Sequence, residues 1–277
     1  MKRSFLYVLL IALTLITGGY AIADFDKGLV LYFTFDNVLG KRILDESGNG
    51  LDAEIIKETK FVKGKYGNAV HITNDTEDCV NVPAADELEI SEEITMMAWV
   101  YHENWKGSSS QWFDKGCYSA RSNSMYGMGV FDENDDPDLA FFPNGSGVGI
   151  ILGEREFHVR TAVENEMRNG MWHHIVGVCE GLNVRMYLDG ENILEDDQRA
   201  PFNFNGINEE DLRIGCAKGK PAYAFAGGSI DEVAIWNRAL SETEIRAVMR
   251  GALFAVSPKD KIATTWGNIK ERLESRY

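Results

Sequence analysis

Residues 225–249, FAGGSIDEVAIWNRALSETEIRAVM, carry most of the information about the fold. Ile230 to Trp236 is an apolar run of strand length that contains two carboxylates. Ser241 and Glu244 form a capping box, which predicts that a helix begins at this point, and Gly251 is placed to end it. We therefore predict a buried strand, a tight polar turn and a short helix.

Short strand-like runs, separated by turn residues, fill most of the remaining chain. Ile94 to Tyr101 (ITMMAWVY) has apolar residues at both odd and even positions, as expected of a central strand that is covered on both faces. Trp172 to Cys179 and Val184 to Leu188 predict a hairpin across a polar turn. About a dozen such strands, with almost no helical periodicity, predict an all-β, two-sheet antiparallel sandwich with one short C-terminal helix.

The first 23 residues have the three parts of a secretory signal peptide. Lys2 and Arg3 form a basic start, Phe5 to Ile16 an apolar core, and Ala21-Ile22-Ala23 a cleavage site of small residues. The apolar core is shorter than the ~20 residues that a spanning helix needs, and no second long apolar run follows. We predict cleavage after Ala23 and a secreted protein, extracellular or in the cell envelope, whose mature form does not span the membrane. An uncleaved anchor is the alternative.

The composition narrows the class of partner. The formal net charge is −15, and an acidic surface repels phosphate backbones, so we expect no nucleic-acid partner. Four cysteines without a CxxC pair argue against a zinc ribbon or a redox motif, while an even number permits disulfides in an oxidising compartment. Cys117 and Cys216 each follow a glycine at an apparent strand end, which favours a bond between them. Cys179, in an apolar strand, could equally be a buried free thiol.

Several segments, taken in order, resemble the laminin G-like (LamG-like) jelly roll of the concanavalin A-like lectin/glucanase superfamily. They are GLVLYFTFDN, DESGNGLDAEI, YGNAVHI, DCVNVP, EEITMMAWVY, WFDKG, MWHHIVGVCEGLNVRMYLDG, LRIG and GGSIDEVAIWNRALSETEI. The resemblance covers roughly residues 28–251, and residues 117–168 match it poorly. It implies one jelly-roll domain over residues 24–251 and leaves residues 252–277 as a C-terminal tail, in which we expect an added strand and a short helix.

The resemblance also implies a structural calcium ion near the first and last strands. The matching candidate ligands are Asp36, Asp45, Asn49 and Asp231. Calcium needs several oxygen ligands, and an unpaired carboxylate at Asp231, inside an apolar strand, would be costly. The alternative is that Asp231 or Glu232 pairs with Arg238 or caps a loop. The family pattern further implies that His174 faces the core and bonds neighbouring backbone.

Sugar rings stack on flat aromatic faces, so a glycan site needs exposed aromatic and polar side chains. Candidates gather in or near the Gly/Ser-rich segment 106–124, namely Trp105, Trp112, Tyr118 and Tyr126, with Arg121 and Asn123 as hydrogen-bonding groups. The alternative is that Trp112 packs in the core. With the resemblance, these residues predict a secreted, non-catalytic module that binds carbohydrate or a cell-surface glycoconjugate.

Two other functions remain open at this point. The first is a protein-interaction or adhesion module that uses loops rather than a sugar groove. The second is a glycoside hydrolase of the same fold, since Glu87, Glu89 and Glu92 loosely match an E-x-D-x-x-E strand. A retaining mechanism needs two carboxyl groups ~5–5.5 Å apart on one face, so the hydrolase reading requires these glutamates to line a groove.

Overall fold

The structure is a computed structural model that describes residues 25–57, 59–73, 79–90, 92–103, 110–115, 126–133, 136–142, 159–162, 170–197, 210–216, 225 and 227–255. The predicted signal peptide, Cys117 and most of the predicted tail lie outside these residues. Within them, the chain forms two antiparallel sheets and one α-helix, which confirms the predicted sandwich. No helix in these segments is long and apolar enough to cross a membrane.

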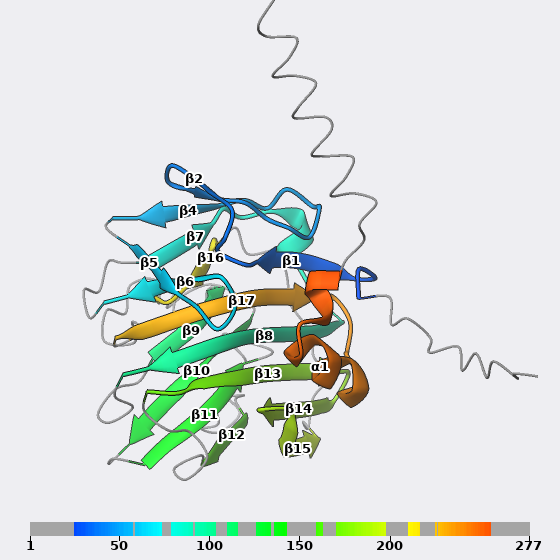
Figure 1. Cartoon of the computed structure of the whole chain (residues 1–277). Coiled ribbons are helices and arrows are strands. Elements are labelled where there is room, and N and C mark those ends of the chain that lie inside the picture. The colour runs from blue at the N-terminus through cyan, green and yellow to red at the C-terminus, as the bar shows by residue number, and fades with distance from the viewer. Residues whose placement is uncertain are drawn as a thin grey trace, which may run out of the picture.

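The first sheet, sheet A, has eight strands in the order β15-β14-β13-β8-β17-β6-β5, and β1 pairs with β17 beside β6. The central position belongs to β8, which contains the predicted central strand Ile94 to Tyr101, and the predicted hairpin lies next to it (Figure 1). The strands are β1 (Leu29–Phe33), β5 (Lys60–Lys63), β6 (Asn68–Ile72), β8 (Glu93–His102), β13 (Trp172–Glu180), β14 (Asn183–Leu188), β15 (Glu191–Asp197) and β17 (Gly228–Trp236).

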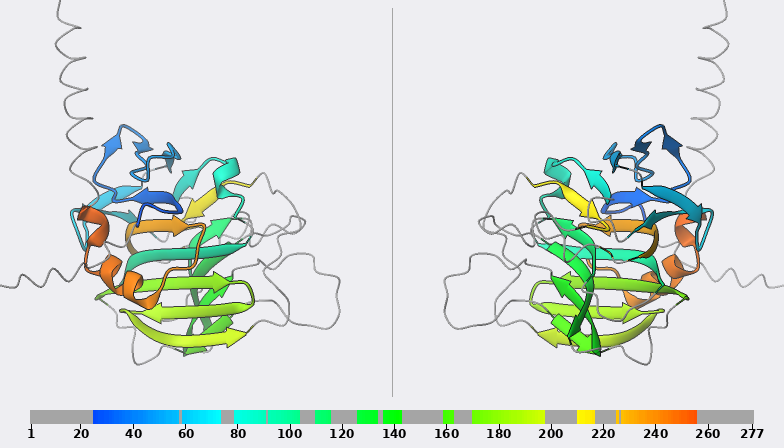
Figure 2. Two further views of the ribbon diagram at one scale, coloured as in Figure 1. Left: turned by 90° about the vertical axis from the view of Figure 1, so that its right-hand side faces the viewer. Right: turned by 90° about the vertical axis from the view of Figure 1, so that its left-hand side faces the viewer.

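The second sheet, sheet B, has nine strands in the order β12-β11-β10-β9-β16-β7-β4-β3-β2. Figure 2 shows the two sheets stacked face to face. The strands are β2 (Val38–Leu39), β3 (Arg42–Ile43), β4 (Ala53–Ile56), β7 (Cys79–Val82), β9 (Ser110–Lys115), β10 (Tyr126–Glu133), β11 (Asp136–Phe142), β12 (Val159–Ala162) and β16 (Leu212–Ile214). Two 3-10 turns, η1 (Asp86–Leu88) and η3 (Ala252–Ala255), complete the described elements.

The main core lies between the sheets, because alternate residues of each strand point inward. On β8, Met96, Ala98 and Val100 face this core, while Met97 belongs to a second apolar cluster on the outer face of sheet A. Helix α1 (Glu242–Met249) covers that second cluster with Ile245 and Val248 (Figures 1 and 2). The outer face of sheet A is therefore covered at one end by the helix.

The predicted capping box holds α1 in place. The hydroxyl of Ser241 accepts a hydrogen bond from the Glu244 backbone N–H, and the Glu244 carboxylate accepts one from the Ser241 N–H at 2.9 Å. Both bonds satisfy backbone donors that the first helical turn would otherwise leave unpaired.

Candidate functional site

A bulge in β17 places two neighbouring carboxylates on the same side of sheet A. Ile230 and Val233 both face the inner core, although a regular strand would turn them to opposite faces. The register with β8 shifts between Asp231 and Ala234, and Glu232 has a φ of 51°. A bulge supplies this kind of extra residue, so Asp231 and Glu232 both lie on the outer side.

The turn between β5 and β6 lies over these carboxylates (Figure 1). The backbone N–H of Tyr66 donates to Asp231 at 3.0 Å, and the phenol of Tyr66 donates to the carbonyl of Met249 at the end of α1. Asp36, just after β1, reaches the same turn and accepts hydrogen bonds from the backbone and side chain of Asn68, both at 2.8 Å. The turn thus joins the first strand, the last strand and the helix.

The fit between the turn and the two aspartates is tight. A Cβ added at Gly64 would lie 2.4 Å from an Asp231 carboxylate oxygen, and one at Gly67 would lie 2.2 Å from an Asp36 carboxylate oxygen. Gly67 also has a φ of 49°, a conformation that favours glycine. Only glycine at these two positions lets backbone and carboxylate approach so closely.

The surroundings of Asp231 and Glu232 disfavour the charged forms of both carboxyl groups. Burial raises the pKa of Asp231 to about 7, and the charge of Asp36 adds to this, although backbone hydrogen bonds oppose it. Burial likewise raises the pKa of Glu232 to about 8, with further contributions from the charges of Asp231 and Glu46. One oxygen of Glu232 hydrogen-bonds the Tyr32 hydroxyl, while the other is buried without a hydrogen-bond partner. We call Asp36, Glu46, Asp231 and Glu232 the acidic cluster.

The structure separates the four predicted calcium ligands into two pairs. Asp36 and Asp231 share the Gly64–Gly67 turn, whereas Asp45 organises the loop after β3. The Asp45 carboxylate accepts hydrogen bonds from the backbone of Tyr32 and Leu51 and from Ser47. The Asn49 amide donates to the carbonyls of Leu29 and Val30. Asp45 and Asn49 are thus occupied in tying this loop to β1.

The other pair, Asp36 and Asp231, offers carboxylate oxygens, which are ligands of the type that calcium prefers. The unpartnered Glu232 oxygen and the close approach of the turn fit a cation at the acidic cluster. In the described segments, however, no three His, Cys, Asp or Glu side chains converge closely enough to hold a metal by themselves. A cation here would therefore need backbone carbonyls or water molecules to complete its coordination.

The prediction of sugar-stacking residues is wrong for two of them, Trp112 and Tyr126. Trp112 on β9 and Tyr126 on β10 are both fully buried and belong to the core between the sheets. Tyr126 also donates to the carbonyl of Leu88 at 3.2 Å. A fully buried ring offers no face to a sugar, so these two residues stabilise the sandwich. Trp105, Tyr118, Arg121 and Asn123 lie outside the described residues.

A different aromatic pair is half-buried on the outer face of sheet A. Tyr101 on β8 and Trp172 on β13 are directly paired, with ring centroids 5.6 Å apart. They share a face with Trp99, which lies one row nearer the helix and is only 6% exposed. The Lys65 ammonium sits 3.9 Å from the centre of the Trp99 ring, and Tyr66 packs edge-on against it. Sequence analysis missed this pair because both residues lie at strand ends.

His174 also lies in the Trp99 row and corrects a prediction. Its ring packs against Trp99, with centroids 5.1 Å apart, on the outer side of sheet A. Neither ring nitrogen has a hydrogen-bond partner, so the ring does not bond neighbouring backbone as the resemblance implies. Burial lowers the pKa of His174 to about 3.

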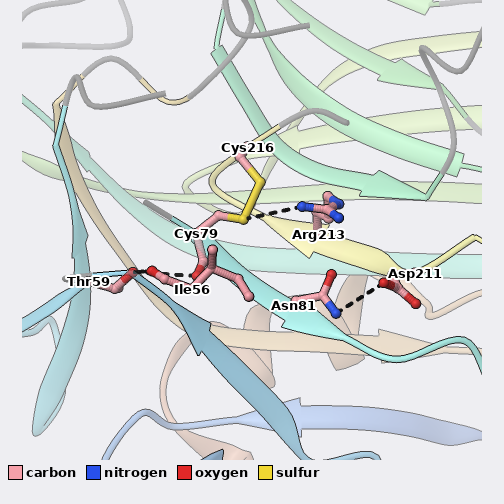
Figure 3. The surroundings of a disulfide bond; sticks show 7 residues. All are labelled: Ile56, Thr59, Cys79, Asn81, Asp211, Arg213 and Cys216. Atoms are coloured by element: carbon pink, nitrogen blue, oxygen red, sulfur yellow. Dashed lines mark hydrogen bonds between the residues drawn. A yellow bond between two sulfur atoms is a disulfide. The ribbon is translucent and has the colours of Figure 1, made fainter. Parts of the chain in front are cut away.

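The disulfide joins Cys79 and Cys216, not Cys117 and Cys216 as predicted (Figure 3). β7 and β16 are adjacent in sheet B, and their pairing brings the two Cα atoms to 5.6 Å. That separation is ordinary for a disulfide. The guanidinium of Arg213, on β16, points toward the Cys79 sulfur, as Figure 3 shows. Cys179 is a buried free thiol, which was one of the alternatives that the sequence left open for this residue.

The three glutamates of the hydrolase hypothesis do not share a strand. Glu87 lies in the 3-10 turn η1, Glu89 follows it, and Glu92 directly precedes β8. They do line a pocket of about 250 Å³, together with Asp86, Ile90, Glu93 and Asn237. Glu89 pairs with the buried Lys115 at 3.0 Å, and Glu93 accepts the backbone N–H of Ala239. The pocket is acidic but lacks the strand geometry on which the motif depends.

Comparison with known proteins places the fold. The sequence profile described as "Concanavalin A-like lectin/glucanases superfamily" matches residues 74–246. Comparison with curated protein sequences gave no match. Among solved structures, domain 4 of AbnA, an extracellular GH43 arabinanase from Geobacillus stearothermophilus solved with arabinotriose, aligns with a TM-score of 0.58 and 16% identity. That alignment covers 80% of this chain and 98% of the domain.

Two other structures show the same architecture. The binding domain of botulinum neurotoxin serotype D/C aligns with a TM-score of 0.61 and 13% identity over 82% of this chain and 53% of that one. A Trypanosoma rangeli sialidase in complex with sialic acid aligns with a TM-score of 0.56 and 16% identity, over 80% of this chain and 32% of the enzyme. At these identities the likeness concerns the fold alone. The profile matches more than half of the residues of this chain, and the chain therefore belongs to the concanavalin A-like lectin/glucanase superfamily.

Proposed function

We propose that this protein is a secreted, non-catalytic carbohydrate-binding module that holds one structural calcium ion. The observation that carries the proposal is the half-buried pair Tyr101 and Trp172, whose rings lie side by side on the sheet surface of a lectin-type fold. Sugar rings stack on such apolar faces, while the polar tips of Tyr and Trp remain available for hydrogen bonds. The disulfide Cys79–Cys216 supports an oxidising, extracellular compartment.

The test of sugar binding is a glycan array followed by titration of the best ligand. Wild type should bind, and Trp172→Ala should weaken binding roughly tenfold, because a stacked ring contributes about 0.5–1.5 kcal/mol beyond its buried area. Trp112→Phe is the matched control, since its ring is fully buried and should not touch the ligand. A wild-type protein that binds no glycan, with or without calcium, would remove the proposal.

Asp36 and Asp231 would hold the calcium ion, with Glu232 beside them. Bound calcium would supply positive charge under the Gly64–Gly67 turn, where burial otherwise disfavours the charged forms of Asp231 and Glu232. A chelator should therefore lower the thermal midpoint of wild type, and Asp231→Asn should abolish that response. Asp45→Asn is the control: it should lower stability through its lost hydrogen bonds yet keep the response to chelator.

The non-catalytic part of the proposal has its own test. The acidic pocket beside η1 holds the glutamates of the hydrolase hypothesis, so the double variant Glu87→Gln/Glu92→Gln tests that hypothesis. We expect wild type to release no reducing ends from the glycan that it binds. Turnover by wild type that disappears in this double variant would instead establish a glycoside hydrolase.

A further inference from the structure

On the outer face of sheet A, the end away from helix α1 carries one continuous row of side chains across five strands. Direct pairings join Lys60 to His71, His71 to Ser229, Ser229 to Tyr101, and Tyr101 to Trp172. Directly paired residues share a face, so all five point outward. At ~4.8 Å per strand the row spans roughly 19 Å, which suits an extended chain rather than a single small molecule. We call it the outer row.

The outer row is mixed in character. Tyr101 and Trp172 form its aromatic end. In the middle, the ring of His71 lies 3.1 Å from the Ser229 hydroxyl. His71 is half-buried, and Ser229 beneath it is buried. Lys60 is exposed at the far end, on the edge strand β5. Stacking surface, hydrogen-bonding groups and positive charge therefore follow one another along a single line.

The charge around the outer row is positive, opposite in sign to the net charge of the whole protein. The chain carries a net charge of −15, yet residues 57–65 (KETKFVKGK) hold four lysines. Lys60 ends the row and Lys65 lies over Trp99 in the next row, and both are exposed. Asp231, the nearest acid of β17, is buried beneath the turn and faces it rather than solvent. A local basic region on an acidic protein attracts anionic ligands over distances of about a Debye length.

We propose that the outer row binds an anionic polysaccharide, with a sugar stacked on Tyr101 and Trp172 and a carboxylate or sulfate group placed at Lys60 and Lys65. This inference rests on the proposed carbohydrate binding and adds the ligand class and its location. The stacked aromatics select a sugar chain, while Lys60 at the far end of the row and Lys65 over Trp99 select its charge. Elements far apart in the sequence, from β5 to β13, build the surface together.

The lysines of β5 provide a matched pair of variants. Phe61 packs against the inner core, so its neighbour Lys60 points outward with the outer row. Lys63, two residues after Phe61, lies on the same face of the strand as Phe61. Lys60→Glu and Lys63→Glu make the same charge change on the same strand. Binding of polygalacturonate and of heparin is measured by calorimetry or biolayer interferometry. Lys60→Glu should weaken it roughly tenfold or more, as expected for loss of a charge-assisted contact. Lys63→Glu should change it by roughly threefold or less, through the general field alone.

Glu103 gives a test in the opposite direction. It is exposed directly after β8, at the same end of the sheet as Tyr101. Glu103→Lys should strengthen binding of the same two polyanions by a few-fold, because it removes repulsion and adds attraction. Thermal melts of every variant show whether it is folded, and the surface positions of Lys60 and Glu103 make loss of the fold an unexpected result.

The outcomes separate the two proposals. Preferential binding of the anionic chains over dextran, with the stated order of variants, supports the inference. Equal binding of dextran and the polyanions, or equal effects of Lys60→Glu and Lys63→Glu, overturns the inference and leaves carbohydrate binding intact. Absence of binding to any polysaccharide overturns both, and retention of an acidic protein with no glycan bound would assign the surface to a protein partner instead.

Discussion

Removal of the Cys79–Cys216 disulfide should be among the most destabilising changes in this protein that leave its sheets unaltered. The bond connects residues that are 137 positions apart in the sequence, so it restricts the unfolded chain strongly. The loop-closure relation gives about 5 kcal/mol for a loop of this length. That figure is an upper value, because residual structure in the unfolded state reduces it, and we expect a loss of roughly 3–5 kcal/mol.

The measurement is urea denaturation of wild type and of the double variant Cys79→Ala/Cys216→Ala, each with and without reductant. Wild type should lose stability in reductant, and the double variant should not respond. Cys179→Ala is the control, because that thiol is free and buried and its loss should cost only about 1 kcal/mol. For a domain of this size, the double variant should melt roughly 10 °C lower.

Two results would refute this reasoning. One is a double variant whose stability lies within about 1 kcal/mol of wild type, which would show that the constraint is not present or not effective. The other is a non-reducing peptide map in which Cys216 is joined to Cys117. That map would restore the pairing expected from the sequence and would require β7 and β16 to be arranged differently.

Three further predictions follow from particular residues. His174 has a pKa of about 3 when folded against 6.5 when unfolded, so its contribution is complete above pH 6.5 and is lost as the pH falls toward 3. Asp189 raises this pKa and Lys65 lowers it, but burial dominates. Between pH 7 and pH 5, His174→Gln should lose about 2 kcal/mol less stability than wild type in urea titrations, and parallel losses would contradict this. Ser241→Ala removes the capping box and should cost about 1 kcal/mol by the same assay, whereas Ser241→Asp should restore most of it. Gly67→Ala should cost at least 1 kcal/mol more than Gly40→Ala, because both have positive φ but only a Cβ at position 67 would lie 2.2 Å from a carboxylate oxygen, that of Asp36; equal losses in thermal melts would show that the Asp36 contact is unimportant.

Sequence patterns predicted the centre of the fold because the central strands and α1 carry strong local signals. β8 is apolar on both parities and covered on both faces, and the Ser241–Glu244 capping box marks the start of α1. Edge strands are harder to predict. β5 (KFVK) and β15 (ENILEDD) are charged, as edge strands often are, and hydrophobic alternation does not reveal them. The basic edge formed by β5, with Lys60, could not be predicted for this reason.

The sites depended on features that local patterns do not contain. The partner of Cys216 was set by the register of β16 against β7, a long-range pairing. The bulge after Ile230 placed Glu232 beside Asp231, although alternation predicts opposite faces. Trp112 faced inward and Trp172 outward, and composition alone gives both residues the same aromatic character. One signal was available: Asp231 and Glu232 break an otherwise apolar strand.

The outer face of sheet A is divided into three zones along β17, and this division links the two proposed binding functions. Helix α1 covers Trp236 at one end, the Gly64–Gly67 turn covers Asp231 in the middle, and Ser229 belongs to the outer row at the other end. A cation that holds the turn on Asp231 would also hold Lys65 over Trp99, next to that row. Chelation should therefore weaken polyanion binding by wild type, although calcium would not touch the ligand. Asp231→Asn should bind with the weaker affinity whether or not calcium is present. If chelator destabilises wild type but leaves its affinity for polygalacturonate unchanged, the turn does not position Lys65 for binding, and the aromatic pair with Lys60 acts alone.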